Sequence, residues 1–240
     1  MAVDAASFLF SAVALVAIGE REQGAPVTRQ GRGRLHREVG EGLRFVFGQP
    51  VLRAITATTA TANLFSGVQT AVEVVFLVRV VHAAPGVIGL VFGAGSVGGL
   101  VAALLAAPIA RRLGGARATF AGILVTGGGL LIPLSSPGAG ALFFAGGLFM
   151  SSFGVVVYNI VQVSFRQRLC PPQLLGRMNA SVRFLVSGVL PFGALAGGAL
   201  GSVIGLRTSL WVAMGGEVAA GGWLVASPLR RAKEFPAPPG

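Results

Sequence analysis

Residues 118–165 read ATFAGILVTGGGLLIPLSSPGAGALFFAGGLFMSSFGVVVYNIVQVSF, a run of 48 residues without a charged side chain. A helix that crosses a bilayer needs about 20 mostly apolar residues, so this run is too long for one span and long enough for two. Turn-forming residues cluster in its middle, at Ser135-Ser136-Pro137-Gly138, and predict a break there. The segments on either side are therefore predicted to be two transmembrane helices.

Four more stretches of similar length lie outside this run. Two of them, residues 86–110 and 184–206, carry no charge, and each of the other two carries a single acid, Glu73 or Glu217. Because lipid offers the backbone no hydrogen-bond partners, such stretches are expected to be helices. Six spans over residues 51–228 are predicted, near 52–79, 86–109, 117–134, 139–164, 180–205 and 208–227.

Composition and charge agree with a membrane protein. Of the 240 residues, 53% are hydrophobic and 11% are charged, whereas a soluble domain carries roughly 25% charged residues. A net charge of +11 would on its own suggest nucleic-acid binding. However, 17 of the 19 basic residues lie in alternate connections and in the tail, which is the positive-inside pattern. The loop at 20–50 and the tail at 229–240 are therefore predicted to be cytoplasmic, and no nucleic-acid partner is expected.

A shorter apolar piece, Ala5–Gly19, precedes these spans. It has 15 residues, which is short for a span, and Asp4 stands where a signal peptide would be basic. Residues 1–19 are therefore predicted to be the end of a transmembrane helix, as if the chain began partway through a longer protein.

Small residues indicate how the helices pack. The fifth full span has glycines at every fourth position, and such spacing lets membrane helices approach closely. A proline, Pro191, lies within this span and is expected to kink it. The second full span has two shorter pairs of the same kind. These glycines are Gly193, Gly197, Gly201 and Gly205 in the fifth span, and Gly89, Gly93, Gly95 and Gly99 in the second.

Two spans carry a polar stripe, at steps of three, four or seven residues that keep its members on one helix face. A stripe of this kind should face a bundle interior or a watery cavity, although hydrogen bonding between helices is the alternative. Two stripes favour a lined pathway. They consist of Thr56, Thr59, Asn63, Ser66, Thr70 and Glu73 in the first full span, and of Ser152, Asn159, Gln162 and Arg166 in the fourth.

Glu73 and Glu217 are the two acids inside the full spans. A carboxylate inside a membrane is costly when ionised and is a functional candidate by default. Each can carry a proton or counter a cationic substrate. For Glu73 the alternative is a place at the membrane interface, near the outer end of its span. Glu217 lies nearer to mid-span, but no stripe surrounds it.

The sequence contains few of the motifs that would indicate an enzyme. His36 and His82 lie in connections on opposite sides of the predicted membrane, so they cannot share a metal ion. The sequence has no HExxH, CxxC, GxSxG or Walker lysine motif. No catalytic residue, metal or cofactor is expected.

The connection after the second full span reads Ala107-Pro-Ile-Ala-Arg111-Arg112-Leu113-Gly114-Gly-Ala-Arg117. It resembles the signature loop of major facilitator superfamily transporters: Arg112, Gly114 and Arg117 match, and Arg111 replaces an acid. Two further stretches, Val3 to Phe8 and Arg166 to Gly193, resemble the enterobactin-exporter-like branch of multidrug and siderophore efflux permeases. The resemblance covers nearly the whole chain, as the second half of that family: the end of helix six and helices seven to twelve.

The resemblance implies an all-α membrane protein, a six-helix half of a major facilitator-type bundle plus the end of a preceding transmembrane helix. It implies a secondary active transporter that exports small amphipathic compounds or siderophores by alternating access. Abundant Gly, Ala and Val with one Lys suggest a bacterial source, hence the inner (plasma) membrane as the location. The alternative is a truncated or split membrane protein without transport of its own, which needs an N-terminal half as partner.

The same resemblance assigns roles to individual residues. A substrate path would include residues of the two stripes, a cytoplasmic gate would include the signature loop, and the two intramembrane acids would be candidate proton carriers. In that order the sets are Asn63, Ser66, Thr70, Glu73, Asn159 and Gln162; then Arg111, Arg112, Gly114 and Arg117; then Glu73 and Glu217.

Overall fold

The computed structural model describes residues 35–170 and 175–231, together with Phe10 and Val13 taken singly. The chain divides into one unit of residues 1–35 and a second of residues 36–240. The helix end predicted at 1–19 and most of the tail lie outside the described residues. Within the described ranges every regular element is a helix, which confirms the all-α membrane class.

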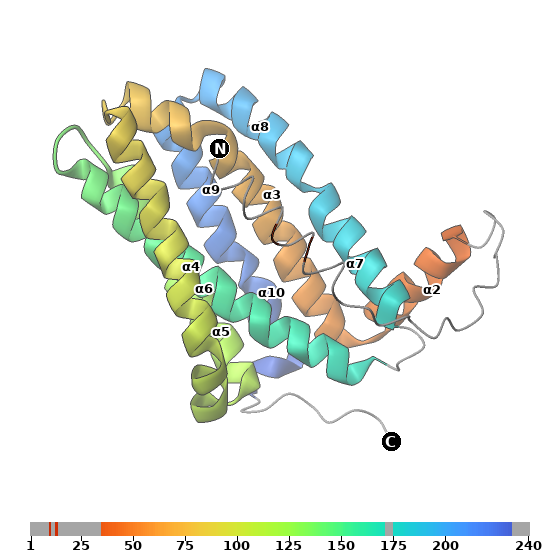
Figure 1. Ribbon diagram of the computed structural model, residues 1–240. Helices are drawn as coiled ribbons and strands as arrows, with labels where there is room; N and C mark the ends of the chain where they lie inside the picture. Colours follow the sequence, from red (N-terminus) through yellow and green to blue (C-terminus); the bar gives the residue numbers. More distant parts are fainter. Residues whose placement is uncertain (1–9, 11–12, 14–34, 171–174, 232–240) are drawn as a thin grey trace. The chain divides into compact units, whose positions relative to one another are not determined.

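Most helices follow the predicted spans to within a few residues. Five segments are long and apolar enough to cross a membrane, at 50–79, 85–113, 115–134, 140–169 and 175–203. The helices are α2 (Leu35–Gly48), α3 (Pro50–Arg79), α4 (Pro85–Leu113), α5 (Gly115–Thr126), the 3-10 helix η2 (Gly127–Leu134), α6 (Gly140–Leu169), α7 (Leu175–Gly188), α8 (Leu190–Val203), α9 (Leu206–Ala220), α10 (Gly222–Val225) and the 3-10 helix η4 (Pro228–Arg231) (Figure 1).

Three of the predicted spans are interrupted. The third changes from α5 to η2 at Gly127, the first of three consecutive glycines, a residue that stabilises an α-helix poorly. The fifth breaks at Val189 between α7 and α8, because Pro191 lacks an N–H and its ring crowds the preceding turn. In the sixth, a turn at Gly221 leaves α9 with only 15 residues.

The segment predicted as a loop at 20–50 ends in a helix, α2. Its apolar residues Leu43 and Val46 are three positions apart, which places them on one face. Val46 is fully buried, in one cluster with Leu52 of α3. Because charged residues are frequent in this segment, the sequence predicts a cytoplasmic loop there and not a helix.

The long helices pack in two groups. α3 lies against α8 and α9, while α6 lies against α4, α5 and η2, and α9 joins the groups through η2 (Figure 1). α3 and α6 make little direct contact with each other. Between them there is room for side chains to line a common space.

Glycines set the closest approach of α8 to α3. A Cβ atom at Gly193 would collide with the carbonyl oxygen of Leu64, and one at Gly197 would lie 2.6 Å from the carbonyl oxygen of Val68. Close backbone contact through small residues is how helices associate in lipid. The packing predicted for the fifth span is therefore present at these two glycines.

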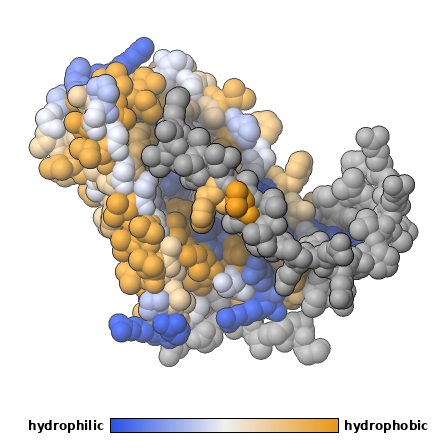
Figure 2. Space-filling view, in the orientation of Figure 1, coloured by the Kyte–Doolittle hydropathy of each residue, from blue (hydrophilic) through white to orange (hydrophobic). Residues whose placement is uncertain are grey.

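Much of the surface is apolar. Leu104, Leu124 and Val203 are 72%, 81% and 81% exposed, respectively. The GxxxG spacing predicted that Gly89 and Gly93 pack against another helix, but a Cβ atom added at either one would meet no atom of a neighbouring segment within 4 Å. On the face drawn in Figure 2, apolar side chains cover most of the helix length and hydrophilic ones gather near the ends. This is the surface that lipid requires.

Two apolar clusters occupy different levels of α3 and α6. One contains Leu52 of α3 and Phe165 of α6. The other contains Phe76 of α3 and Phe144 of α6. Thr59, Asn63 and Ser66 of α3 and Ser152 of α6 lie between the clusters, and this arrangement positions the site.

Candidate functional site

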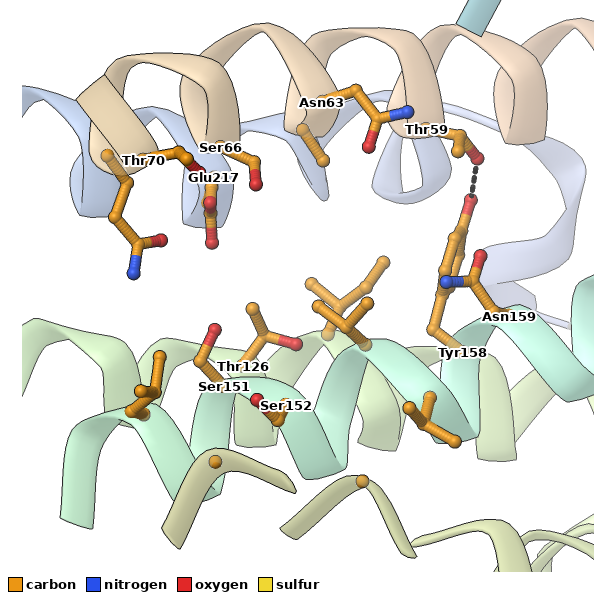
Figure 3. A pocket seen from close by; sticks show the side chains of 18 of the residues that line it. Thr59, Asn63, Ser66, Thr70, Thr126, Ser151, Ser152, Tyr158, Asn159 and Glu217 are labelled. Carbon is orange, nitrogen blue, oxygen red and sulfur yellow. Dashed lines mark hydrogen bonds between the residues drawn. The ribbon is translucent and has the colours of Figure 1, made fainter. Parts of the chain in front are cut away.

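A cavity of about 490 Å³ lies between α3 and α6, at the level between the two apolar clusters (Figure 3). Small-molecule sites in proteins typically measure about 300–1,000 Å³, so a compact organic molecule would fit. Its walls come from α3, α4, α5, α6 and α9. The lining residues are Thr58, Thr59, Ala62, Asn63, Ser66, Gln69, Thr70, Glu73, Phe92, Gly95, Ser96, Gly99, Ile123, Thr126, Leu148, Ser151, Ser152, Val155, Val156, Tyr158, Asn159 and Glu217.

α3 supplies the more polar wall. The first member of its predicted stripe, Thr56, is buried outside the cavity, and the others line it because their spacing keeps them on one face. Asn63 is anchored by its Nδ2, which donates to the carbonyl oxygen of Val186 in α7 at 3.0 Å. The stripe residues that line the cavity are Thr59, Asn63, Ser66, Thr70 and Glu73.

α6 forms the facing wall, but one of the predicted path residues lies outside it. Ser152 and Asn159 line the cavity, whereas Gln162 does not, although it is only 2% exposed. The Nε2 of Gln162 donates to Oδ1 of Asn159 at 3.3 Å. Gln162 therefore lies just beyond the lining, which ends on α6 at Asn159, and its role in the substrate path stays a prediction. Arg166 is also buried outside the lining.

A hydroxyl pair joins the two walls at this end of the cavity. Oγ1 of Thr59 and Oη of Tyr158 lie 2.8 Å apart, and the carbonyl oxygen of Ile55 lies 2.8 Å from the first and 3.1 Å from the second. Each hydroxyl has one proton, so two of these three contacts are hydrogen bonds at any moment. The sequence does not predict a role for Tyr158, because it is not part of the polar stripe on its helix.

The two acids come together in the cavity. Glu73 and Glu217 both line it, and each is 8% exposed. Nε2 of Gln69 donates to Oε2 of Glu73 at 3.0 Å. Figure 3 shows Glu217 directed from α9 into the open space. The sequence could not pair them, because one acid in an apolar helix does not show which neighbour it faces.

The signature loop lies away from the cavity. Arg111 and Arg112 end α4 and Arg117 lies in α5, and all three are exposed. Gly114 joins the helices with a φ of 85°, a conformation that residues with a Cβ rarely adopt. None of these four residues lines the cavity, and a gating role for them stays a prediction.

Arg207, at the start of α9, is held by several contacts. The guanidinium of Arg207 donates to the carbonyl oxygens of Pro133 and Ser135, both at 2.7 Å. Its central carbon lies 5.4 Å from the ring centroid of Phe76, within the range of a cation–π contact. Arg207 thus ties α9 to the end of η2 and to α3.

Metal chemistry has few candidate ligands in the described part of the chain. Within residues 35–170 and 175–231, no three His, Cys, Asp or Glu side chains come together as a metal site. The cavity contributes two carboxylates and otherwise hydroxyl, amide and apolar groups.

Comparison with known proteins gives one match. The family model described as MFS/sugar transport protein matches residues 1–170. No curated protein and no solved structure matches the chain.

Proposed function

The chain belongs to the major facilitator superfamily of membrane transporters, and we propose that it exports small amphipathic compounds by alternating access. The cavity between α3 and α6 carries this proposal, because it has the volume of a small-molecule site and combines polar with apolar walls. Transporters of this kind bind substrate near the membrane midplane, between helices that rearrange around it.

Within this proposal, the described helices act as the second half of a twelve-helix transporter. α3 to α6 correspond to helices seven to ten, α7 with α8 to helix eleven, and α9 with α10 to helix twelve. Asn63, Ser66 and Thr70 of α3 face the substrate. The exposed arginines at the α4–α5 connection lie on the cytoplasmic side, as the charge distribution predicts.

Efflux from proteoliposomes tests this proposal. The full chain is reconstituted with a panel of fluorescent amphipathic dyes and ferric siderophores inside, and their release is measured with and without a proton gradient. We expect release of at least one compound, and slower release with Asn63→Leu, which places an apolar side chain in the cavity wall. Ser164→Ala is the control, because Ser164 is exposed on α6 and does not line the cavity.

Absence of release for the whole panel contradicts export by this chain alone. If release then appears on co-reconstitution with a separate six-helix half, the chain is one part of a two-part transporter. Equal loss with the Asn63 and Ser164 variants would contradict the assignment of the cavity as the substrate path.

A further inference from the structure

We infer that the cavity binds an amphipathic organic cation, held between the carboxylates of Glu73 and Glu217. This inference rests on the proposed transport function and specifies the chemical class of its substrate. It starts from charge: of the 22 lining residues, two are acidic and none is basic.

Glu217 lacks a counter-group. It is 8% exposed, its side chain is directed into the cavity (Figure 3), and no described residue forms a hydrogen bond or an ion pair with it. Burying a carboxylate without a partner is costly. A cation in the cavity supplies the missing partner and gains a desolvated, charge-assisted contact.

A second unpartnered group lies on α3. Thr58 lines the cavity and is 2% exposed, yet its Oγ1 forms no hydrogen bond with any described residue. A buried polar atom without a partner in the protein is usually satisfied by water or by a ligand. Among the residues that line the cavity, a carboxylate and a buried hydroxyl therefore have no hydrogen-bond partner in the described part of the chain.

The basic side chains nearest to the cavity do not line it. Arg166 is the basic residue nearest to the cavity along α6, and it lies beyond Tyr158, outside the lining. Arg207 is occupied by two carbonyl oxygens and by the ring of Phe76. Neither side chain neutralises Glu217, so the cavity has an acidic character that disfavours anions.

The remaining walls favour an organic cation over a metal ion. Phe92, Ile123, Leu148 and Val155 give apolar surface, and an aromatic ring also attracts a cation through its π face. A hard metal ion such as Ca²⁺ takes six to eight oxygen ligands, whereas two carboxylates and scattered hydroxyls line a space of about 490 Å³. An organic cation with an apolar body can contact the carboxylates through its charge and the apolar residues through its body.

Equilibrium binding of two matched ions tests this inference without requiring transport. The full chain is placed in lipid nanodiscs, and binding of tetraphenylphosphonium and of tetraphenylborate is measured, with empty nanodiscs subtracted. The two ions share a shape and differ in sign. We expect saturable binding of the cation alone, weakened on the order of tenfold by Glu217→Gln and also by Glu73→Gln, as loss of a buried charge partner predicts.

Two further variants separate charge from folding. Ser164→Ala changes an exposed side chain of α6 that does not line the cavity, and should bind like the parent chain. Glu217→Asp keeps the charge and should retain most of the binding. Cation binding that survives both cavity substitutions, equal binding of both ions, or binding displaced by Mg²⁺ but not by organic cations would overturn the inference.

The test also distinguishes the two proposals. Export of a neutral or anionic compound that Glu73→Gln and Glu217→Gln leave unchanged would refute the cation site and leave the export proposal standing. Cation binding that depends on both acids, without export of any compound, would support the cation site and refute the export proposal.

Discussion

At the scale of single residues, the hydroxyl of Tyr158 stands out because it links two helices that otherwise make little contact. It reaches across from α6 to Thr59 and to the carbonyl oxygen of Ile55 in α3. Tyr158 and Thr59 also line the cavity. The same contact therefore links α3 to α6 and lies at one end of the site.

The shared carbonyl predicts how the losses of these hydroxyls combine. Tyr158→Phe and Thr59→Val should each lower the free energy of unfolding by about 1 kcal/mol, the usual effect of one hydrogen bond. Two of the three contacts are hydrogen bonds in the parent chain, one remains in either single variant because the other hydroxyl can still donate to Ile55, and none remains in the double variant, so the two losses should add. Denaturant unfolding in detergent measures the cycle, and a double loss well above or below the sum would contradict this arrangement.

The site was predictable from the sequence where a pattern repeats and not where a residue stands alone. Five stripe residues of α3 were found because steps of three and four fix one face. Gln162 continues the α6 stripe, but the sequence does not show at which turn a cavity ends. Glu217 was recognised as unusual, yet its neighbour Glu73 depends on how α9 is rotated against α3, which is a tertiary property.

At the scale of helices, close packing of α8 on α3 depends on the absence of a side chain at two positions. A methyl group at Gly193 would meet the backbone of Leu64, which cannot yield as a flexible side chain would. Gly198 lies in the same helix and has open space around it. These two glycines form a matched pair for an experiment.

Gly193→Ala should destabilise the protein by about 1–3 kcal/mol, because overpacking forces the helices apart. Gly198→Ala should be neutral or stabilising by up to about 1 kcal/mol, since alanine has the higher helix propensity. Thermal unfolding in the same detergent compares them. Equal melting temperatures for the two variants would show that α8 does not pack on α3 as described.

Apolar length predicted the main helices well, since the long segments begin and end within a few residues of the observed bounds. The breaks were harder. Pro191 gave a clear signal for the interruption in the fifth span, whereas the change to a 3-10 helix at Gly127 depends on three glycines whose effect is set by packing. Helix α2 was missed because its amphipathic pattern is short and rich in charge.

At the scale of the whole molecule, the exposed apolar surface and the family assignment establish a multi-pass membrane protein. Orientation in the bilayer rests on the distribution of basic residues. Arg112 and Ser136 provide a clear test, because both are exposed and the segment 115–134 separates them. The positive-inside pattern places the first in the cytoplasm and the second outside.

Cysteine labelling in intact cells checks this orientation. Ser136→Cys should react with a membrane-impermeant maleimide, whereas Arg112→Cys should react only after permeabilisation. The native Cys170 is the background control: it is buried, and burial raises the pKa of its thiol, so less of the reactive thiolate is present. Reaction of Arg112→Cys in intact cells, with Ser136→Cys protected, would reverse the topology.

Among the described helices, α9 is poorly suited to enter a bilayer unaided. α9 is short, has Arg207 in its first turn and carries Glu217 deeper in, and a buried charge costs on the order of 3 kcal/mol during insertion by the translocon. Its stabilising neighbours are the carbonyl oxygens of Pro133 and Ser135 and the walls of the cavity. All of these belong to segments that the ribosome makes earlier. Biogenesis of this helix is therefore expected to be cooperative, with retention in the membrane depending on helices already in place.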